Sequence, residues 1–135
     1  MMAPAAEMNI IKTTTAEIWL DAEGIIWVVY SQSDLDRNAI EENFKVVLEL
    51  GGGVPRPLLN IVQSVTGTDK GGRDYGTRPE IIQAVSALAL VTSSMVSKVL
   101  GNFFIFVAKP EYPTRLFSSE NEALAWLRHY LPEED

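Results

Sequence analysis

Residues 101–127 have the sequence GNFFIFVAKPEYPTRLFSSENEALAWL, and this stretch decides the fold of the chain. Its apolar first part predicts the end of a helix, which Pro110 breaks because proline cannot continue one. Thr114–Phe117 predicts a short edge strand. Ser119-Glu120-Asn121-Glu122 is a capping box, which opens a helix by pairing side chains with free backbone N–H groups. A helix, a strand and a second helix in this order are typical of an α/β domain.

Residues 15–30 predict a β-hairpin. Thr15–Leu20 and Ile25–Tyr30 flank Asp21-Ala22-Glu23-Gly24, where an aspartate opens the turn and a glycine closes it. The second arm is apolar throughout, as expected of a strand that is buried on both faces. Ile10–Thr13 can extend the first arm.

A helix and a central strand are predicted next. Leu35–Leu50 carries apolar residues at helical spacing, with Asp36 as its N-cap. The glycines at 51–53 end this helix, because glycine accepts the left-handed conformation of a C-terminal cap. Pro57 then fixes an extended approach to Leu58–Val62, whose charge-poor sequence indicates a central parallel strand.

The middle of the chain is less regular. Val65–Pro79 is rich in glycine, and a helix can start within it at Thr68 or at the next residue. Glu80–Ser86 predicts a short helical piece, and Ala87–Val91 predicts another buried strand. A capped helix with a wide apolar side is expected over residues 94–108.

These elements follow the order ββαβαβαβα without a repeat or a linker. We expect an α/β fold with a mixed, largely parallel sheet of about five strands and roughly four helices. The N-terminal β-hairpin forms the antiparallel edge of this sheet. Residues 1–14 are expected to be a flexible or partly ordered N-terminus, residues 15–131 a single domain, and residues 132–135 a solvated tail.

Composition and charge exclude several classes of function. The chain has 135 residues and a net charge of −7, which argues against a nucleic-acid partner. It has no cysteine and a single histidine, His129, so thiol chemistry and a multi-histidine metal site are excluded. Its apolar runs are too short to cross a bilayer, and residues 1–7 lack the basic start of a secretory signal. We therefore expect a cytoplasmic protein with no membrane insertion, no metal and no cofactor.

The element order and two motifs resemble the SpoIIAA-like (STAS-type) domains, and within them a small bacterial group of unestablished function. The first motif is the opening hairpin Trp19-Leu20-Asp21-Ala22-Glu23-Gly24. The second is the ending, which combines Gly101–Phe104, Lys109-Pro110 and Pro113–Phe117. The resemblance covers the chain from Glu17 onward. It implies a SpoIIAA-like fold and a role as a small partner-binding switch, which some members control by phosphorylating a serine at a helix start.

The stretch at the equivalent position holds the candidate phosphorylation or anion site. Where the family has an Asp-Ser-Ser-Gly turn, this chain offers Thr66, Thr68 and Asp69. A phosphate on Thr68 at a helix start would meet free N–H groups, with Lys70 and Arg73 near enough to pair with it. The same glycine-rich stretch could hold another anion. The alternatives are that Thr68 only caps a helix and that the stretch is a flexible connector.

A second candidate is an apolar surface. It comprises Met95, Phe103, Phe104, Phe106 and Trp126. Successive positions of a helix point in different directions, so these phenylalanines cannot all enter one core. The surplus indicates a homodimer or another protein contact, or a site for a small apolar ligand. The alternative is a wide core face.

No group of residues predicts a catalytic site. The acidic residues are expected in turns and at helix starts, His129 at the surface, and Lys109 and Arg115 in structural ion pairs. The leading hypothesis is a non-enzymatic regulatory or protein-interaction module. The alternative is a protein that binds a small ligand, a lipid or a metabolite, and phosphoryl or acyl chemistry at Thr66–Arg73 ranks last.

Overall fold

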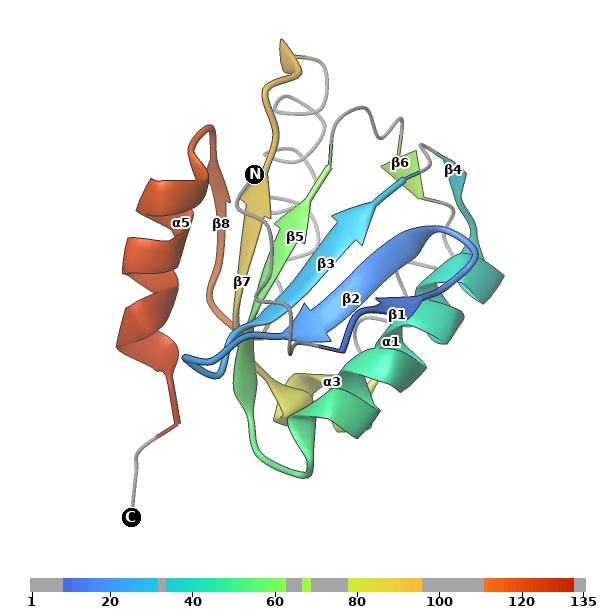
Figure 1. Cartoon of the computed structure of the whole chain (residues 1–135), viewed down its shortest axis with the longest axis horizontal. Coiled ribbons are helices and arrows are strands. Elements are labelled where there is room, and N and C mark those ends of the chain that lie inside the picture. The colour runs from blue at the N-terminus through green and yellow to red at the C-terminus, as the bar shows by residue number, and fades with distance from the viewer. Residues whose placement is uncertain (1–8, 32–33, 63–66, 69–77, 96–110, 133–135) are drawn as a thin grey trace.

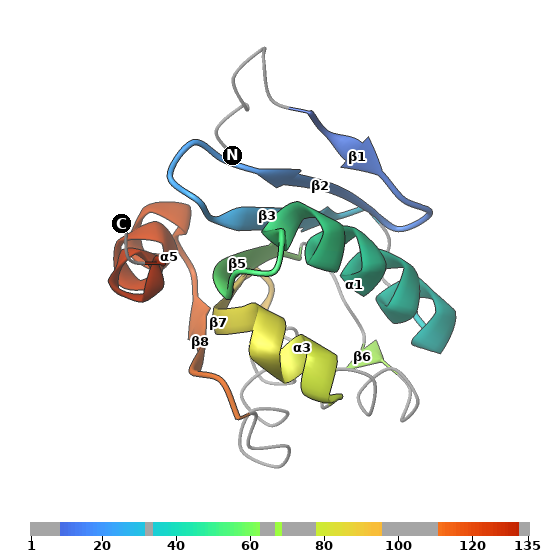
Figure 2. The ribbon, with the colours of Figure 1, turned by 90° about the horizontal axis from the view of Figure 1, so that it is seen from below.

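The computed structural model describes residues 9–31, 34–62, 67–68, 78–95 and 111–132. Over these ranges the chain forms a twisted six-stranded sheet with helices on both faces (Figures 1 and 2). A separate pair of two-residue strands lies beside it.

The sheet has the strand order β1-β2-β3-β5-β7-β8. Its strands are β1 (Ile11–Lys12), β2 (Ala16–Leu20), β3 (Ile26–Tyr30), β5 (Arg56–Ile61), β7 (Val85–Val91) and β8 (Thr114–Phe117). The pairs β1–β2 and β2–β3 are antiparallel, and β3, β5, β7 and β8 run parallel. The predicted mixed, largely parallel sheet with an antiparallel hairpin at its edge is therefore confirmed, with six strands where about five were expected.

Helices pack on both faces of the sheet. They are α1 (Arg37–Gly51), α3 (Pro79–Ala84) and α5 (Glu120–Leu127), which continues into the 3₁₀ turn η1 (Arg128–Tyr130). Figure 2 shows α5 on one face and α1 with α3 on the other. We call these the α5 face and the α1 face. The second small sheet pairs β4 (Asp34–Leu35) with β6 (Gly67–Thr68).

Each face has its own hydrophobic core, because neighbouring residues of a strand point to opposite sides. On the α5 face, Leu59 and Trp27 pack with Leu124 and Leu127 of α5. The core of the α1 face joins strand residues to α1 and α3, and its main members are Ile18, Ile26, Val28, Leu58, Val47 and Ile81. The apolar second arm of the hairpin supplies both cores, as its sequence predicts.

The first long helix begins and ends where local chemistry predicts. The Asp36 side chain accepts a hydrogen bond of 2.9 Å from the backbone N–H of Ala39. At the other end Gly52 has φ +62°, the left-handed conformation that glycine adopts without strain.

The approach to the central strand differs from the prediction. Pro57 does not precede β5 but lies inside it, buried, opposite Ala87. The pairing register with β7 shifts between Arg56 and Pro57. Because proline has no N–H to donate, it is accepted within a sheet at such an irregularity.

The N-terminal segment, expected to be flexible or partly ordered, is described from residue 9 onward and contains a short strand. Ile11 and Lys12 pair with β2. Behind this strand, Thr13 Oγ1 donates to Asn43 Oδ1 of α1 at 2.6 Å, and Asn43 Nδ2 donates to Thr15 Oγ1 at 2.9 Å. Thr15 and Asn43 are buried, and these hydrogen bonds satisfy their side chains and connect the start of the sheet to the helix.

Candidate functional site

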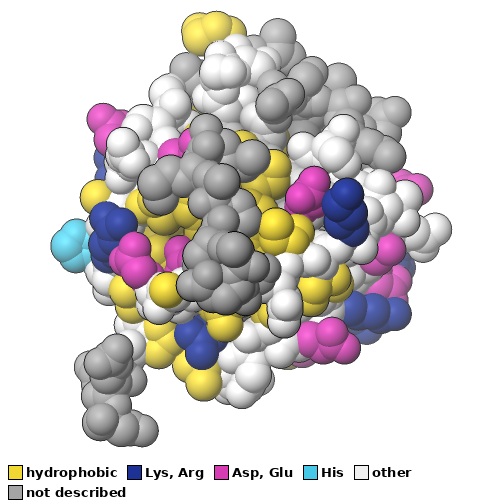
Figure 3. Space-filling view, viewed as in Figure 1, with side chains coloured by type: hydrophobic (Ala, Val, Ile, Leu, Met, Phe, Trp, Pro, Cys, Tyr) yellow, Lys and Arg dark blue, Asp and Glu magenta, His cyan; other side chains and the backbone are white. Residues whose placement is uncertain are grey.

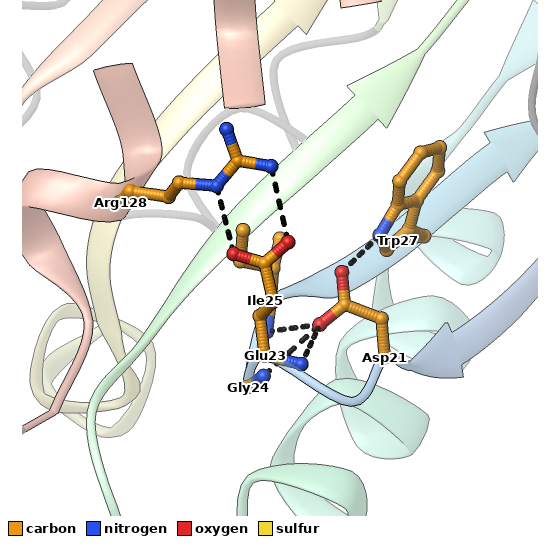
Figure 4. Close-up of polar contacts among 6 residues, drawn as sticks. All are labelled: Asp21, Glu23, Gly24, Ile25, Trp27 and Arg128. Atoms are coloured by element: carbon orange, nitrogen blue, oxygen red, sulfur yellow. Dashed lines mark hydrogen bonds and ion pairs between the residues drawn. The ribbon is translucent and has the colours of Figure 1, made fainter. Parts of the chain in front are cut away.

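The hairpin turn is organised by a single carboxylate (Figure 4). Oδ1 of Asp21 accepts hydrogen bonds from the backbone N–H groups of Glu23, Gly24 and Ile25, at 2.9, 3.0 and 3.0 Å. Its Oδ2 accepts a fourth bond of 2.8 Å from Nε1 of Trp27. Trp27 is buried and stacks on Trp19 with ring centroids 5.3 Å apart. The aspartate therefore fixes both the turn and the indole beneath it.

The same turn is tied to the C-terminal end of the domain. Arg128 donates from Nε to Glu23 Oε2 at 2.7 Å and from a second guanidinium nitrogen to Oε1 at 3.1 Å. This bidentate hydrogen bond lowers the pKa of Glu23 below its ordinary value. Arg56 adds a longer contact of 3.5 Å to the Gly24 carbonyl oxygen and one of 3.2 Å to that of Gly51. These groups hold elements together, and every oxygen of the two carboxylates accepts at least one hydrogen bond.

A different surface runs along α5 and the edge of the sheet. We call it the α5–β8 surface and define it as Arg115, Phe117, Trp126 and Tyr130. The Trp126 ring lies 5.6 Å from that of Phe117 and 5.1 Å from that of Tyr130, measured between centroids. The Arg115 guanidinium lies 5.3 Å from the centre of the Phe117 ring, within the range of a cation–π contact. Arg115 is exposed and the three aromatic side chains are half-buried, so the surface is open to solvent.

Figure 3 shows the face of the molecule that carries α5, where hydrophobic side chains are exposed among charged ones. β8 is the last strand of the sheet, and within the described residues it pairs only with β7. An edge strand that carries unpaired backbone groups is a ready template for another chain.

Two half-buried tyrosines, Tyr30 and Tyr112, and the amide of Asn60 lie on the α1 face. Burial raises the pKa of Tyr30 to about 12, with a smaller contribution from Tyr112 nearby, and burial also raises the pKa of Tyr112. Asn60 Oδ1 is buried and has no hydrogen-bond partner among the residues that the structure describes. Asn60 stands in β5 opposite Val28 and Leu90, in otherwise apolar surroundings.

The predicted anion site is only partly described. Thr66, Asp69, Lys70 and Arg73 lie outside the described residues. Thr68 lies in β6, where its backbone pairs with Leu35 of β4. Thr68 itself is extended and belongs to a strand pair, and residues 69–77, over which the predicted helix would run, lie outside the described residues.

The predicted apolar surface is divided in the same way. Phe103, Phe104 and Phe106 lie outside the described residues. Met95 is 70% exposed, and it does not belong to the α5–β8 surface. Of the two members that the structure describes, Trp126 is the one that lies together with other aromatic side chains.

Sequence reasoning missed several partners. Arg115 was expected in an ion pair, but the structure places it over Phe117. Alternation along the strand puts both residues on one face, and this signal was available in the sequence. Glu23 and Arg128 are 105 residues apart, so no local pattern joins them. Lys109, the other expected ion-pair residue, lies outside the described residues, and His129 is exposed as predicted.

Two general features bear on the class of protein. None of the helices in the described ranges is long and apolar enough to cross a membrane. Within the same ranges, no three histidine, aspartate or glutamate side chains gather closely enough to hold a metal ion.

The fold and its surfaces define a SpoIIAA-like α/β domain. A crystal structure of an uncharacterised protein of the DUF3478 family from Shewanella loihica PV-4, described as having a SpoIIAA-like fold, matches with a TM-score of 0.54 and 12% identity. The match covers 93% of this chain and 98% of that chain, and at this identity it shows the fold alone. The model of the domain of unknown function DUF7793 matches residues 18–131, and the chain belongs to this family.

Other comparisons add no function. A crystal structure of a protein of unknown function from Arthrobacter sp. FB24 is 29% identical, over 87% of this chain and 95% of that chain, with a TM-score of 0.31. No curated protein matches the chain.

Proposed function

We propose that this domain is a non-enzymatic interaction module that works through protein contacts at the α5–β8 surface. The observation that carries the proposal is the joining of three half-buried aromatic rings and one exposed arginine beside an edge strand. Aromatic residues and arginine are the side chains enriched at protein interfaces and at their hot spots.

The packing of this surface supports contact with a partner. Trp126 is held between Phe117 and Tyr130, so little side-chain freedom remains to be lost on binding. Rings that are positioned before binding cost less entropy when a partner covers them. Arg115 adds a cation to a chain whose net charge is −7.

We propose no catalytic role because the acidic side chains in the hairpin turn and at the start of α1 have structural roles. Asp21 is the acceptor of four hydrogen bonds, and Asp36 caps α1. The pKa of Glu23 is lowered by Arg128, whereas a general acid needs a raised one.

The experiment compares affinity capture by the wild-type chain, by Trp126→Ala and by Val54→Ser. Val54 is an exposed apolar residue outside the α5–β8 surface, so Val54→Ser controls for a general loss of surface hydrophobicity. The proposal predicts partners that are retained by the wild type and by Val54→Ser but lost with Trp126→Ala. Circular dichroism must show that all three chains are folded. Identical partners for all three, or none, would count against the proposal.

A second candidate function is the binding of a small, largely apolar ligand at the α1 face. Its specific support is Asn60 Oδ1, a buried acceptor between Val28 and Leu90 to which no group in the described part of the chain donates. A ligand hydroxyl or amide would supply the missing hydrogen bond. Native mass spectrometry of freshly purified chain tests this, with Asn60→Leu as the comparison. A co-purifying molecule that Asn60→Leu loses would support the candidate, and an unmodified wild-type mass would reject it.

A further inference from the structure

The hydrogen bonds on the β7 side of β8 show which backbone groups of β8 remain unpaired. The carbonyl oxygens of Pro113 and Phe117 accept bonds from Leu88 and Thr92, at 2.8 and 3.1 Å. Because alternate peptide groups of a strand point to opposite sides, the N–H and C=O groups of Thr114 and Leu116 point away from β7. These groups form the unpaired edge of the six-stranded sheet within the described residues.

We propose that a second copy of this chain pairs with β8 in antiparallel orientation, with Leu116 opposite the second copy's Leu116. This inference rests on the proposed function and names its partner. The two sheets would join into one continuous sheet about a two-fold axis through this residue pair. Such an isologous contact uses the same surface on both copies.

The backbone alone restricts the register. In an antiparallel ladder, residues whose N–H and C=O groups face the neighbouring strand form hydrogen-bonded pairs. Leu116 meets itself as such a pair, and Thr114 meets the second copy's Ser118. Arg115 and the second copy's Phe117 then form the non-hydrogen-bonded pair between them, in which side chains approach most closely.

The side chains fit this register. Arg115 and Phe117 lie on the α5 face, as their mutual contact shows, so Leu116 lies on the opposite face. Pairing places each copy's Arg115 directly opposite the other copy's Phe117, which repeats across the interface the cation–π contact present within each chain. The leucine pair adds an apolar contact on the other face.

The neighbouring register, in which the two-fold axis passes through Arg115 instead of Leu116, is unfavourable. It would put Arg115 directly opposite the second copy's Arg115, and like charges facing each other destabilise a strand pair. In the proposed register the two arginines are diagonal neighbours, and a phenylalanine ring lies opposite each of them. The edge is therefore complementary to itself, and this favours a second copy as the occupant.

The test uses Leu116→Cys, since the natural chain has no cysteine. A hydrogen-bonded antiparallel pair has a Cα–Cα distance of about 5.5 Å, inside the range of roughly 4.4–6.8 Å that a disulfide spans. Under mild oxidation we expect Leu116→Cys to form a cross-linked dimer on a non-reducing gel. Thr114→Cys is the matched control, because its two thiols would be about 13 Å apart along the strands. Cross-linking of Thr114→Cys to the same extent would overturn the register.

Light scattering of the wild-type chain gives a second, independent readout. We expect a mass that rises toward two chains with concentration, and a dissociation constant about tenfold weaker for Arg115→Gln, which lacks both cation–π contacts. A folded Leu116→Cys chain that stays uncross-linked, with a wild-type mass of one chain at all concentrations, would overturn the dimer. If the chain is monomeric but its capture of another protein still depends on Trp126, the proposed function stands. Only the inference that the partner is a second copy is then overturned.

Discussion

Replacing Asp21 tests the account of the hairpin turn. The carboxylate accepts three backbone N–H groups through Oδ1 and the Trp27 indole N–H through Oδ2. Asp21→Asn keeps one acceptor oxygen but turns an NH₂ group toward either the indole or the backbone donors. A donor then faces a donor, and one of the four hydrogen bonds cannot form.

The size of the expected loss of stability follows from the burial of Trp27. Trp27 is only 3% exposed, so its indole N–H is poorly placed to find water as a substitute when its acceptor is lost. A buried donor left unsatisfied costs about 1–3 kcal/mol. We therefore expect Asp21→Asn to lower the free energy of unfolding by about 2 kcal/mol. Asp21→Ala, which also releases the three turn N–H groups, should cost about 3–4 kcal/mol.

The assay is urea unfolding followed by tryptophan fluorescence and by circular dichroism. A double-mutant cycle with Trp27→Phe isolates the indole bond, because phenylalanine keeps an aromatic ring and has no N–H. In the Trp27→Phe chain, the loss of unfolding free energy caused by Asp21→Asn should be smaller than in the wild type by at least about 1 kcal/mol. The reasoning is refuted if the two costs agree within about 0.3 kcal/mol, or if Asp21→Ala leaves stability unchanged.

Three further predictions concern single groups. Glu23→Gln should lower stability by about 0.5 kcal/mol, since the ion pair with Arg128 is exposed. Because the pKa of Glu23 is lowered, the pair stabilises the domain above the ordinary glutamate pKa and is lost as pH falls through the lowered value, so acid unfolding of wild type and Glu23→Gln should converge at low pH. Gly24→Ala should cost about 1–3 kcal/mol in a thermal melt, because φ is +103° and the new Cβ would lie 3.0 Å from Arg56 Nη1; an unchanged melting temperature would contradict this strain. Burial raises the pKa of Tyr30 to about 12, so its neutral form stabilises the fold below the ordinary tyrosine pKa, and this contribution is lost as pH rises through 12. Ultraviolet titration should show a late phenolate that Tyr30→Phe removes, and an unchanged titration curve would argue against the burial.

Elements with local chemistry of their own could be predicted from the sequence. β8 has the predicted bounds, Thr114–Phe117, and Ser119 Oγ accepts a bond of 3.3 Å from the N–H of Glu122 at the start of α5. Capping residues and turn residues act on their immediate neighbours, so their signals survive in a single sequence. The tie of Asp36 to Ala39 is of the same kind.

Elements that depend on distant partners could not be predicted. β4 and β6 are two residues long, and only their pairing with each other makes them strands. Pro57 is accepted within β5 because of an irregular register against β7, which no pattern in the sequence specifies. The α5–β8 surface joins a strand to a helix. Alternation along the strand places Arg115 and Phe117 on one face, and Trp126 stands beside the apolar stripe of its helix, but no pattern in the sequence brings the two elements together.

The mass of the wild-type chain in solution tests the central claim most directly. If the α5–β8 surface makes protein contacts and a second copy is the partner, the mass should rise with concentration from 14.9 kDa toward twice that value, and Arg115→Gln should shift this rise to higher concentration. A wild-type chain that remains at 14.9 kDa throughout, together with capture experiments that do not depend on Trp126, would contradict it.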